Sequence, residues 1–305
     1  MLAYKAQIRK LFHAHIKVKI PAFSDERLFD EFYGVLEQID KHYNSYSEGS
    51  FFDKINRQAG EFVNVDDETL HILEQVLYFS ELFDREYDIT IMPLIRLWGF
   101  YKDDQRRIPD SGEIAQAKQL IDYKRIEIKD HQVKIGQGQE IVTGSFMKSY
   151  AVDKLAKAIR REQITDAIIN AGGSTILAIN NKVHPEWTVD VKNAQSDGYL
   201  FKLKLSNACY STSAQNKIFV EIDGQKYGHI LSPVTGYPST NKQIGIITET
   251  CMIGDIISTG LFNQSVDGFI KKMKELSKQF PVSGFLVDKD NNIAFTEGFE
   301  KNIIA

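Results

Sequence analysis

The fold is constrained most strongly by pairs of short apolar segments that are joined by tight turns. The clearest pair runs from Ile218 to Ile222 and from Lys226 to Ile230 around Asp223-Gly224, a dipeptide that favours a two-residue hairpin turn. Similar pairs are predicted within 126–135, 167–179 and 284–295. Because hairpins place neighbouring strands antiparallel, these pairs predict a mainly antiparallel sheet.

Helical periodicity fills most of the chain between the hairpins. Leu28, Phe29, Phe32, Leu36 and Ile39 repeat at helical spacing after Ser24, which we expect to cap this helix. Tyr43–Asn56 is predicted to be a loop. Further helices are predicted to begin near Asp66 or Asp67 and at Asp110 or Ser111, and to span 147–161, 252–262 and 266–280. Hairpins interleaved with helices indicate an α+β fold, not a doubly wound parallel sheet.

The composition excludes several classes of protein. A chain of 305 residues, 43% hydrophobic and 26% charged, is typical of a globular protein and long enough for a sizeable core. The net charge of -4 argues against a nucleic-acid partner, because such binding needs a basic surface. The two cysteines, Cys209 and Cys251, exclude a disulfide framework and any C-x-x-C motif.

No membrane span is expected, since no apolar run approaches the roughly 18 residues that a bilayer requires. The segment Met1 to Phe12 has no continuous apolar stretch, small-residue cleavage site or lipidation cysteine. The given chain is therefore not expected to be a secretory precursor, and the compartment stays open between the cytoplasm and a trimmed, exported lipoprotein.

Two side chains four residues apart are candidates for a metal site. Asp255 and Thr259 fall on one face of a predicted helix, and oxygen ligands of this kind suit Mg²⁺. The alternative is that Thr259 bonds back to the carbonyl four residues earlier, as threonines within helices often do.

Histidines offer two further candidates. His229 ends a predicted strand beside a turn-rich segment, so it is either a group for proton transfer or a structural residue bonded to a turn carbonyl. His13 and His15 alternate in a predicted strand, where they would face the same side and bind a metal or phosphate, or simply form a strand face. Gly172-Gly173 allows a ligand to approach the backbone or makes a tight turn.

The order of several segments resembles the ApbE family of FAD:protein FMN transferases over nearly the whole length. The most specific block is Tyr87-Asp88-Ile89-Thr90 with Pro93-Leu94 and Leu97-Trp98-Gly99-Phe100, which is similar to the family's F-D-x-T-x-x-P-L-x-x-L-W-G-F segment. The other matching blocks, in order, are Ser45 to Asn56, Gly144 to Asp153, Asn170-Ala171-Gly172-Gly173, Ser211-Thr212-Ser213, His229 to Pro238 and Asp255 to Phe262.

The resemblance implies an ApbE-like α+β fold of the T-fold type, as a single domain over 1–305 with packed helices, an arrangement that allows two lobes around a central cleft. It implies Mg²⁺-dependent transfer of FMN from FAD to a Thr or Ser hydroxyl of a target flavoprotein, which releases AMP. FAD and a flavoprotein acceptor are the implied partners. A carrier that binds flavin without transfer, and a hydrolase that splits FAD into FMN and AMP, are the alternatives.

The resemblance also implies roles for individual residues. Asp255, Thr259 and the backbone carbonyl of Ser145 match the Mg²⁺ ligands, and His229 matches the position of a base. The positions implied to contact FAD are Tyr46, Glu86, Tyr87, Asp88, Val142, Lys148, Gly172, Gly173 and Leu231. Departures from the family pattern include Val142, Ser174 and Ser232, each of which stands where the family has Asp.

Overall fold

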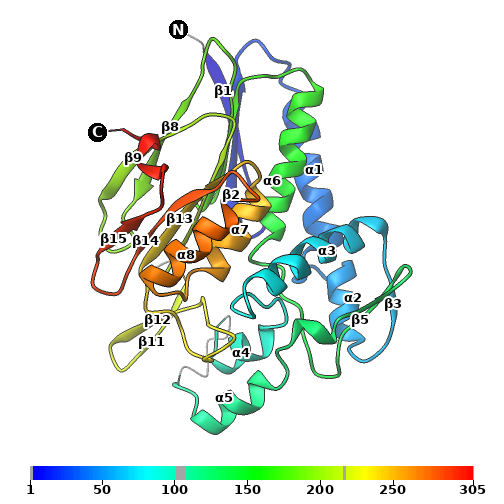
Figure 1. The fold of residues 1–305 in the computed structure, drawn as a ribbon. Coiled ribbons are helices and arrows are strands. Elements are labelled where there is room, and N and C mark those ends of the chain that lie inside the picture. The colour runs from blue at the N-terminus through cyan, green and yellow to red at the C-terminus, as the bar shows by residue number, and fades with distance from the viewer. Residues whose placement is uncertain (1–2, 101–106, 216–217, 305) are drawn as a thin grey trace.

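The computed structural model describes residues 3–100, 107–215 and 218–304. At the centre of this described chain lies an antiparallel sheet of eight strands in the order β1-β2-β6-β7-β10-β13-β14-β15 (Figure 1). The strands are β1 Tyr4–Leu11, β2 Ala14–Pro21, β6 Ala167–Ala171, β7 Thr175–Ile179, β10 Cys209–Ala214, β13 Gln243–Thr248, β14 Ser283–Val287 and β15 Ile293–Phe295. The predicted α+β class and antiparallel pairing are therefore confirmed.

Helices cover one face of this sheet (Figure 1). Their apolar side chains join those of the inward strand positions, such as Leu286, in the largest core cluster. The helices on this side are α1 Leu28–Tyr43, α3 Asp67–Leu82, α6 Met147–Arg161, α7 Cys251–Gly260 and α8 Val266–Leu276.

A smaller sheet packs on the opposite face. It has the order β16-β9-β8, formed by β8 Trp187–Lys192, β9 Tyr199–Leu205 and β16 Ile303–Ile304. Phe285, which neighbours the inward-facing Leu286, points into this second core. Side chains therefore alternate between two cores along the central strands, as expected for a sheet buried on both faces.

The remaining elements surround the lower end of the sheet in Figure 1. They are α2 Phe51–Arg57, α4 Met92–Leu97, α5 Ser111–Lys118, β3 Val63–Asn64, β4 Glu127–Lys129, β5 Gln132–Lys134, β11 Phe219–Ile222, β12 Gln225–Gly228 and the 3-10 turn Tyr123–Arg125. A second 3-10 turn, Phe299–Asn302, lies beside β9 near the C-terminus (Figure 1). Trp98, after α4, is fully buried, and its indole Nε1 donates to the carbonyl of Gly236 at 2.9 Å. This bond holds the segment that follows His229 against α4.

Several local predictions are confirmed. Helix α6 has the predicted bounds, and Asp110 caps α5 through a capping box with Glu113. The hairpin predicted within 126–135 is formed by β4 and β5.

Two local predictions are wrong. Ser24 does not cap α1, whose N-cap is Arg27 without a side-chain cap bond. Instead, Asp30 and Glu31 place negative charge in its first turn, where the helix dipole favours it. The loop predicted at 43–56 contains α2, which begins after Ser50 because the Ser50 hydroxyl accepts the N–H of Asp53.

Among the residues that the structure describes, none of the helices has the length and apolarity needed to cross a bilayer.

Candidate active site

A cavity of about 760 Å³ lies where β10, the start of α6 and the second half of α7 meet the turn between β6 and β7 and the segments 142–145 and 229–233. All the predicted site residues except Gly173 line it: Tyr46, Glu86, Tyr87, Asp88, Val142, Ser145, Lys148, Gly172, His229, Leu231, Asp255 and Thr259. Gly173 is exposed in the turn between β6 and β7, where its N–H donates to Asn170 Oδ1 at 2.8 Å. Residues from distant parts of the sequence therefore meet in one space.

Helix α7 presents the two predicted side-chain ligands of the metal. The Thr259 hydroxyl donates to the backbone carbonyl of Asp255 at 2.9 Å, so the predicted back-bond is present. That bond uses the single hydroxyl proton of Thr259. The lone pairs of Oγ1 are still available to coordinate a cation. Back-bonding and metal binding are therefore compatible at this residue.

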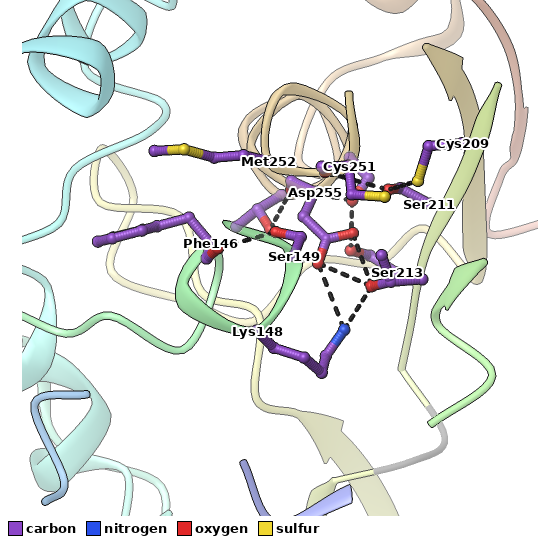
Figure 2. A network of polar contacts seen from close by, with 12 residues as sticks. Phe146, Lys148, Ser149, Cys209, Ser211, Ser213, Cys251, Met252 and Asp255 are labelled. Atoms are coloured by element: carbon purple, nitrogen blue, oxygen red, sulfur yellow. Dashed lines mark hydrogen bonds and ion pairs between the residues drawn. The ribbon is translucent and has the colours of Figure 1, made fainter. Parts of the chain in front are cut away.

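The Asp255 carboxylate is held by two side chains (Figure 2). The Thr175 hydroxyl lies 3.1 Å from Oδ1 and 2.9 Å from Oδ2, and Lys148 Nζ lies 3.5 Å from Oδ2. Lys148 also donates to Thr175 Oγ1. Thr175 is not among the predicted site residues, because a single strand residue carries no sign of its long-range partners.

Ser145 lies in the turn before α6, and its hydroxyl is 3.0 Å from that of Tyr87. No cluster of three or more His, Cys, Asp or Glu side chains that suits a metal occurs within the described ranges. The predicted donors are one carboxylate, one hydroxyl and one backbone carbonyl. Such a sparse oxygen set fits Mg²⁺, which usually keeps several waters and binds substrate phosphates.

His229 follows β12 directly and lines the cavity. Its ring Nδ1 lies 3.1 Å from the carbonyl of Ile218, so the carbonyl contact considered as an alternative is present. A carbonyl only accepts, so this contact requires the proton on Nδ1 and makes Nε2 the basic nitrogen of the neutral ring. The structural contact is therefore compatible with proton transfer at Nε2.

The predicted pairing of His13 with His15 on one strand face is wrong. Phe12 and His13 form the turn between β1 and β2, with φ of 50° and 56°. His13 lines the cavity beside Tyr46, whereas His15 is an exposed residue of β2.

Three consecutive acidic and aromatic residues form another wall. Tyr87 and Asp88 are buried, and Asp88 accepts the N–H and hydroxyl of Thr90 at 2.8 and 2.7 Å and the N–H of Tyr123 at 3.0 Å. Burial raises the pKa of the Asp88 carboxyl and that of Glu86. Asp88 thus anchors the wall, while Glu86 brings a second carboxyl to the cavity.

The first turn of α7 is surrounded by buried side chains of neighbouring elements. The Asp153 carboxylate of α6 accepts the first two backbone N–H groups of α7, a role that was not predicted from the sequence. Cys209 and Cys251 are free and buried there, and burial raises the pKa of both thiols. Thiols are the less nucleophilic form of cysteine, so these residues act as packing groups.

A sequence model described as the ApbE family matches residues 12–282. The chain belongs to the ApbE family. It is similar to proteins named FAD:protein FMN transferase from Treponema pallidum, at 24% identity over 95% of this chain and 85% of the relative, and from Klebsiella pneumoniae, at 26% over 78% and 75%.

Solved structures with the same fold include the ApbE protein of Thermotoga maritima, with a TM-score of 0.91 and 24% identity over 99% of this chain and 100% of the other. The flavin transferase ApbE from Vibrio cholerae has a TM-score of 0.85 and 18% identity over the same shares. These likenesses confirm the ApbE-like fold.

Two of the three named departures from the ApbE motifs, Val142 and Ser232, have a local structural setting that suits them, whereas nothing in the structure explains Ser174. Val142 is buried in an apolar cluster with Leu231. Ser232 accepts the N–H groups of Val234 and Thr235 at 3.2 and 3.1 Å, which are bonds that an Asp could also make. Its hydroxyl donates to Glu86 at 3.3 Å, however, where an Asp would bring a second negative charge.

Proposed function

We propose that this protein transfers the FMN part of FAD to a Thr or Ser hydroxyl of a target flavoprotein, with Mg²⁺ as cofactor and AMP as product. The observation that carries the proposal is the meeting of Asp255, Thr259, Ser145 and His229 in one cavity. Its volume of about 760 Å³ lies in the usual range for ligand sites. The names of the relatives from T. pallidum and K. pneumoniae support the same activity.

The Asp255 carboxylate, Thr259 Oγ1 and the Ser145 carbonyl would hold Mg²⁺. The ion, when bound, supplies positive charge that stabilises the pyrophosphate oxygens as negative charge develops on them. The cavity residues proposed to contact FAD are Tyr46, Glu86, Tyr87, Asp88, Val142, Lys148, Gly172 and Leu231, with Gly173 in the adjoining turn.

His229 is the proposed base. The acceptor hydroxyl oxygen forms a bond to the FMN phosphorus, and the bond from that phosphorus to the bridging pyrophosphate oxygen breaks. AMP leaves with the bridging oxygen, and the hydroxyl proton moves to Nε2 of His229. The contact between Nδ1 and the Ile218 carbonyl, 3.1 Å long, holds the ring in the tautomer that this step requires.

The test uses purified protein with FAD and Mg²⁺, with and without a flavoprotein domain that carries an acceptor threonine. We expect flavin fluorescence on the denatured acceptor band and one AMP for each flavin attached. AMP and free FMN without acceptor labelling would instead support the hydrolase, and saturable FAD binding without consumption would support the carrier.

A further inference from the structure

The ion pair between Lys148 and Asp255 places a cation at the carboxylate that would bind Mg²⁺. Lys148 Nζ lies 3.5 Å from Asp255 Oδ2, and the two side chains are only 15% and 13% exposed. Within the described ranges, Lys148 is the only basic side chain within 4.0 Å of this carboxylate. Each charge therefore compensates the other in a site with little access to water.

Thr175 connects the two charged groups. It accepts a hydrogen bond from Lys148 and donates its own proton to the Asp255 carboxylate, which lies 2.9 to 3.1 Å away. Thr175 is fully buried, so its hydroxyl has a fixed position. The ammonium group is therefore held at the site by two partners.

The position of Lys148 in α6 is unfavourable for the helix itself. Lys148 is the second residue of α6, and the first turn of this helix contains no acidic residue. A positive charge there faces the positive end of the helix dipole. The ion pair between Lys148 and Asp255 offsets this unfavourable interaction with the helix dipole.

We propose that Lys148 acts as an internal cation that occupies the Asp255 site until a divalent metal ion replaces it. The inference rests on the proposed function for the identity of the metal ligands. A divalent cation bound to the same carboxylate would repel the ammonium group and compete with it for the negative charge of Asp255. Binding of the metal would therefore favour displacement of Lys148, and the pyrophosphate of the substrate is the anion that this cavity would offer it.

The exchange predicts that metal and pyrophosphate favour each other's binding. Without phosphate, a displaced ammonium group loses its counter-ion, which lowers the affinity for the metal. With phosphate, Lys148 gains a new partner, which removes that penalty. Such reciprocal coupling follows from thermodynamic linkage.

The test measures Mn²⁺ binding to the nucleotide-free protein by electron paramagnetic resonance, which counts free Mn²⁺. We expect Lys148→Met to bind Mn²⁺ on the order of ten-fold more tightly than the wild type, because the competing cation is gone. Lys148→Arg keeps the charge and should bind as weakly as the wild type.

Lys154→Met is the matched control. Lys154 lies in the same helix and pairs with Glu68, and it does not line the cavity. The Lys154→Met substitution removes a positive charge from the same helix and leaves the contacts of Asp255 unchanged, so the Mn²⁺ affinity of this variant should equal that of the wild type. Circular dichroism and thermal unfolding confirm that each variant is folded.

Equal Mn²⁺ affinities for the wild type and Lys148→Met would overturn the exchange, as would an equal gain in Lys154→Met. Absence of Mn²⁺ binding in every protein would overturn both the metal site and the exchange. A gain in Mn²⁺ affinity confined to Lys148→Met, together with no flavin transfer by the wild type, would leave the exchange in place and refute only the proposed function.

Discussion

The carboxylate of Asp153 accepts the backbone N–H of Cys251 at 2.8 Å, so a residue of α6 caps the start of α7. Its second oxygen accepts the N–H of Met252 at 2.9 Å. The first turn of a helix leaves such donors unpaired, and Thr250, the N-cap of α7, makes no side-chain cap bond. Asp153 therefore fixes the helix that carries Asp255 and Thr259.

Burial of the Asp153 carboxyl makes stability depend on pH. Burial raises the pKa of Asp153 from 3.8 to about 6, so the folded protein binds the proton more tightly than the unfolded chain. The resulting stabilisation is complete below about pH 4 and is lost as the pH rises through about 6. Relative to Asp153→Asn, the wild type should lose at most about 3 kcal/mol of unfolding free energy across this range.

Urea unfolding at several pH values measures the difference between the two proteins. Asp190→Asn, at an exposed position of β8, controls for the change from acid to amide. If the unfolding free energies of the wild type and Asp153→Asn changed in parallel with pH, the pH dependence could not come from Asp153.

Thr175→Val tests the bond to Asp255. Valine keeps the shape of the side chain and the strand preference but leaves the Asp255 carboxylate, whose side chain is only 13% exposed, without one donor. The unfolding free energy should fall by about 1–3 kcal/mol. Thr188→Val, on the exposed face of β8, should change it by less than about 0.5 kcal/mol. An equal effect of both variants would mean that the hydroxyl of Thr175 has no special role.

Ser232→Asp restores the residue that the ApbE motif has at this position. Because Ser232 Oγ lies 3.3 Å from the half-buried Glu86 carboxyl, the new charge should destabilise the fold by about 1 kcal/mol. Adding Glu86→Gln should reverse most of that loss. A double-mutant cycle in urea with no coupling between the two positions would contradict the proposed repulsion.

His229→Gln should lower the rate of FMN transfer by about 10²- to 10⁴-fold, the usual contribution of a general base. FAD affinity, measured by fluorescence quenching, should stay within about three-fold, because the ring is proposed to act on the acceptor hydroxyl. His131→Gln, at a side chain that is 67% exposed, serves as the control. A parallel loss of FAD affinity would assign His229 to binding instead of proton transfer.

Removal of the metal should abolish transfer. EDTA, or Asp255→Ala at saturating Mg²⁺, should reduce transfer by at least about 10²-fold, since a bound metal contributes several kcal/mol to such reactions. Asp197→Ala, in the exposed loop between β8 and β9, should keep wild-type activity. Full Mg²⁺-dependent activity in Asp255→Ala would refute the assignment of this ligand.

Most of the fold could be predicted because its signals are local. The periodicity of α6 extends over 15 residues and yields both ends of the helix. Helix α2 has only 7 residues, too few for a periodic pattern, although Ser50 and Asp53 provided a capping signal. The Phe12-His13 turn was missed because both residues adopt a left-handed backbone that favours glycine or asparagine.

The residues of the candidate site could be predicted where they belong to the motifs that occur in the same order in the ApbE family. The collinear blocks named residues that the structure brings into one cavity, including Lys148 and His229. Thr175 and Asp153 were missed because their importance comes from partners 80 and 98 residues away in the sequence. Such contacts follow from the packing of β7, α6 and α7, which no local pattern encodes.

The bond between Trp98 and the Gly236 carbonyl also gives the molecule an optical probe. The chain has two tryptophans: Trp98 lies in the cluster beside the cavity, and Trp187 lies in the core beneath the small sheet. Trp187→Phe would leave a single emitter, tied by its indole to the segment that follows His229. Changes in the emission of that variant would report, without any attached dye, when a ligand rearranges this wall of the cavity.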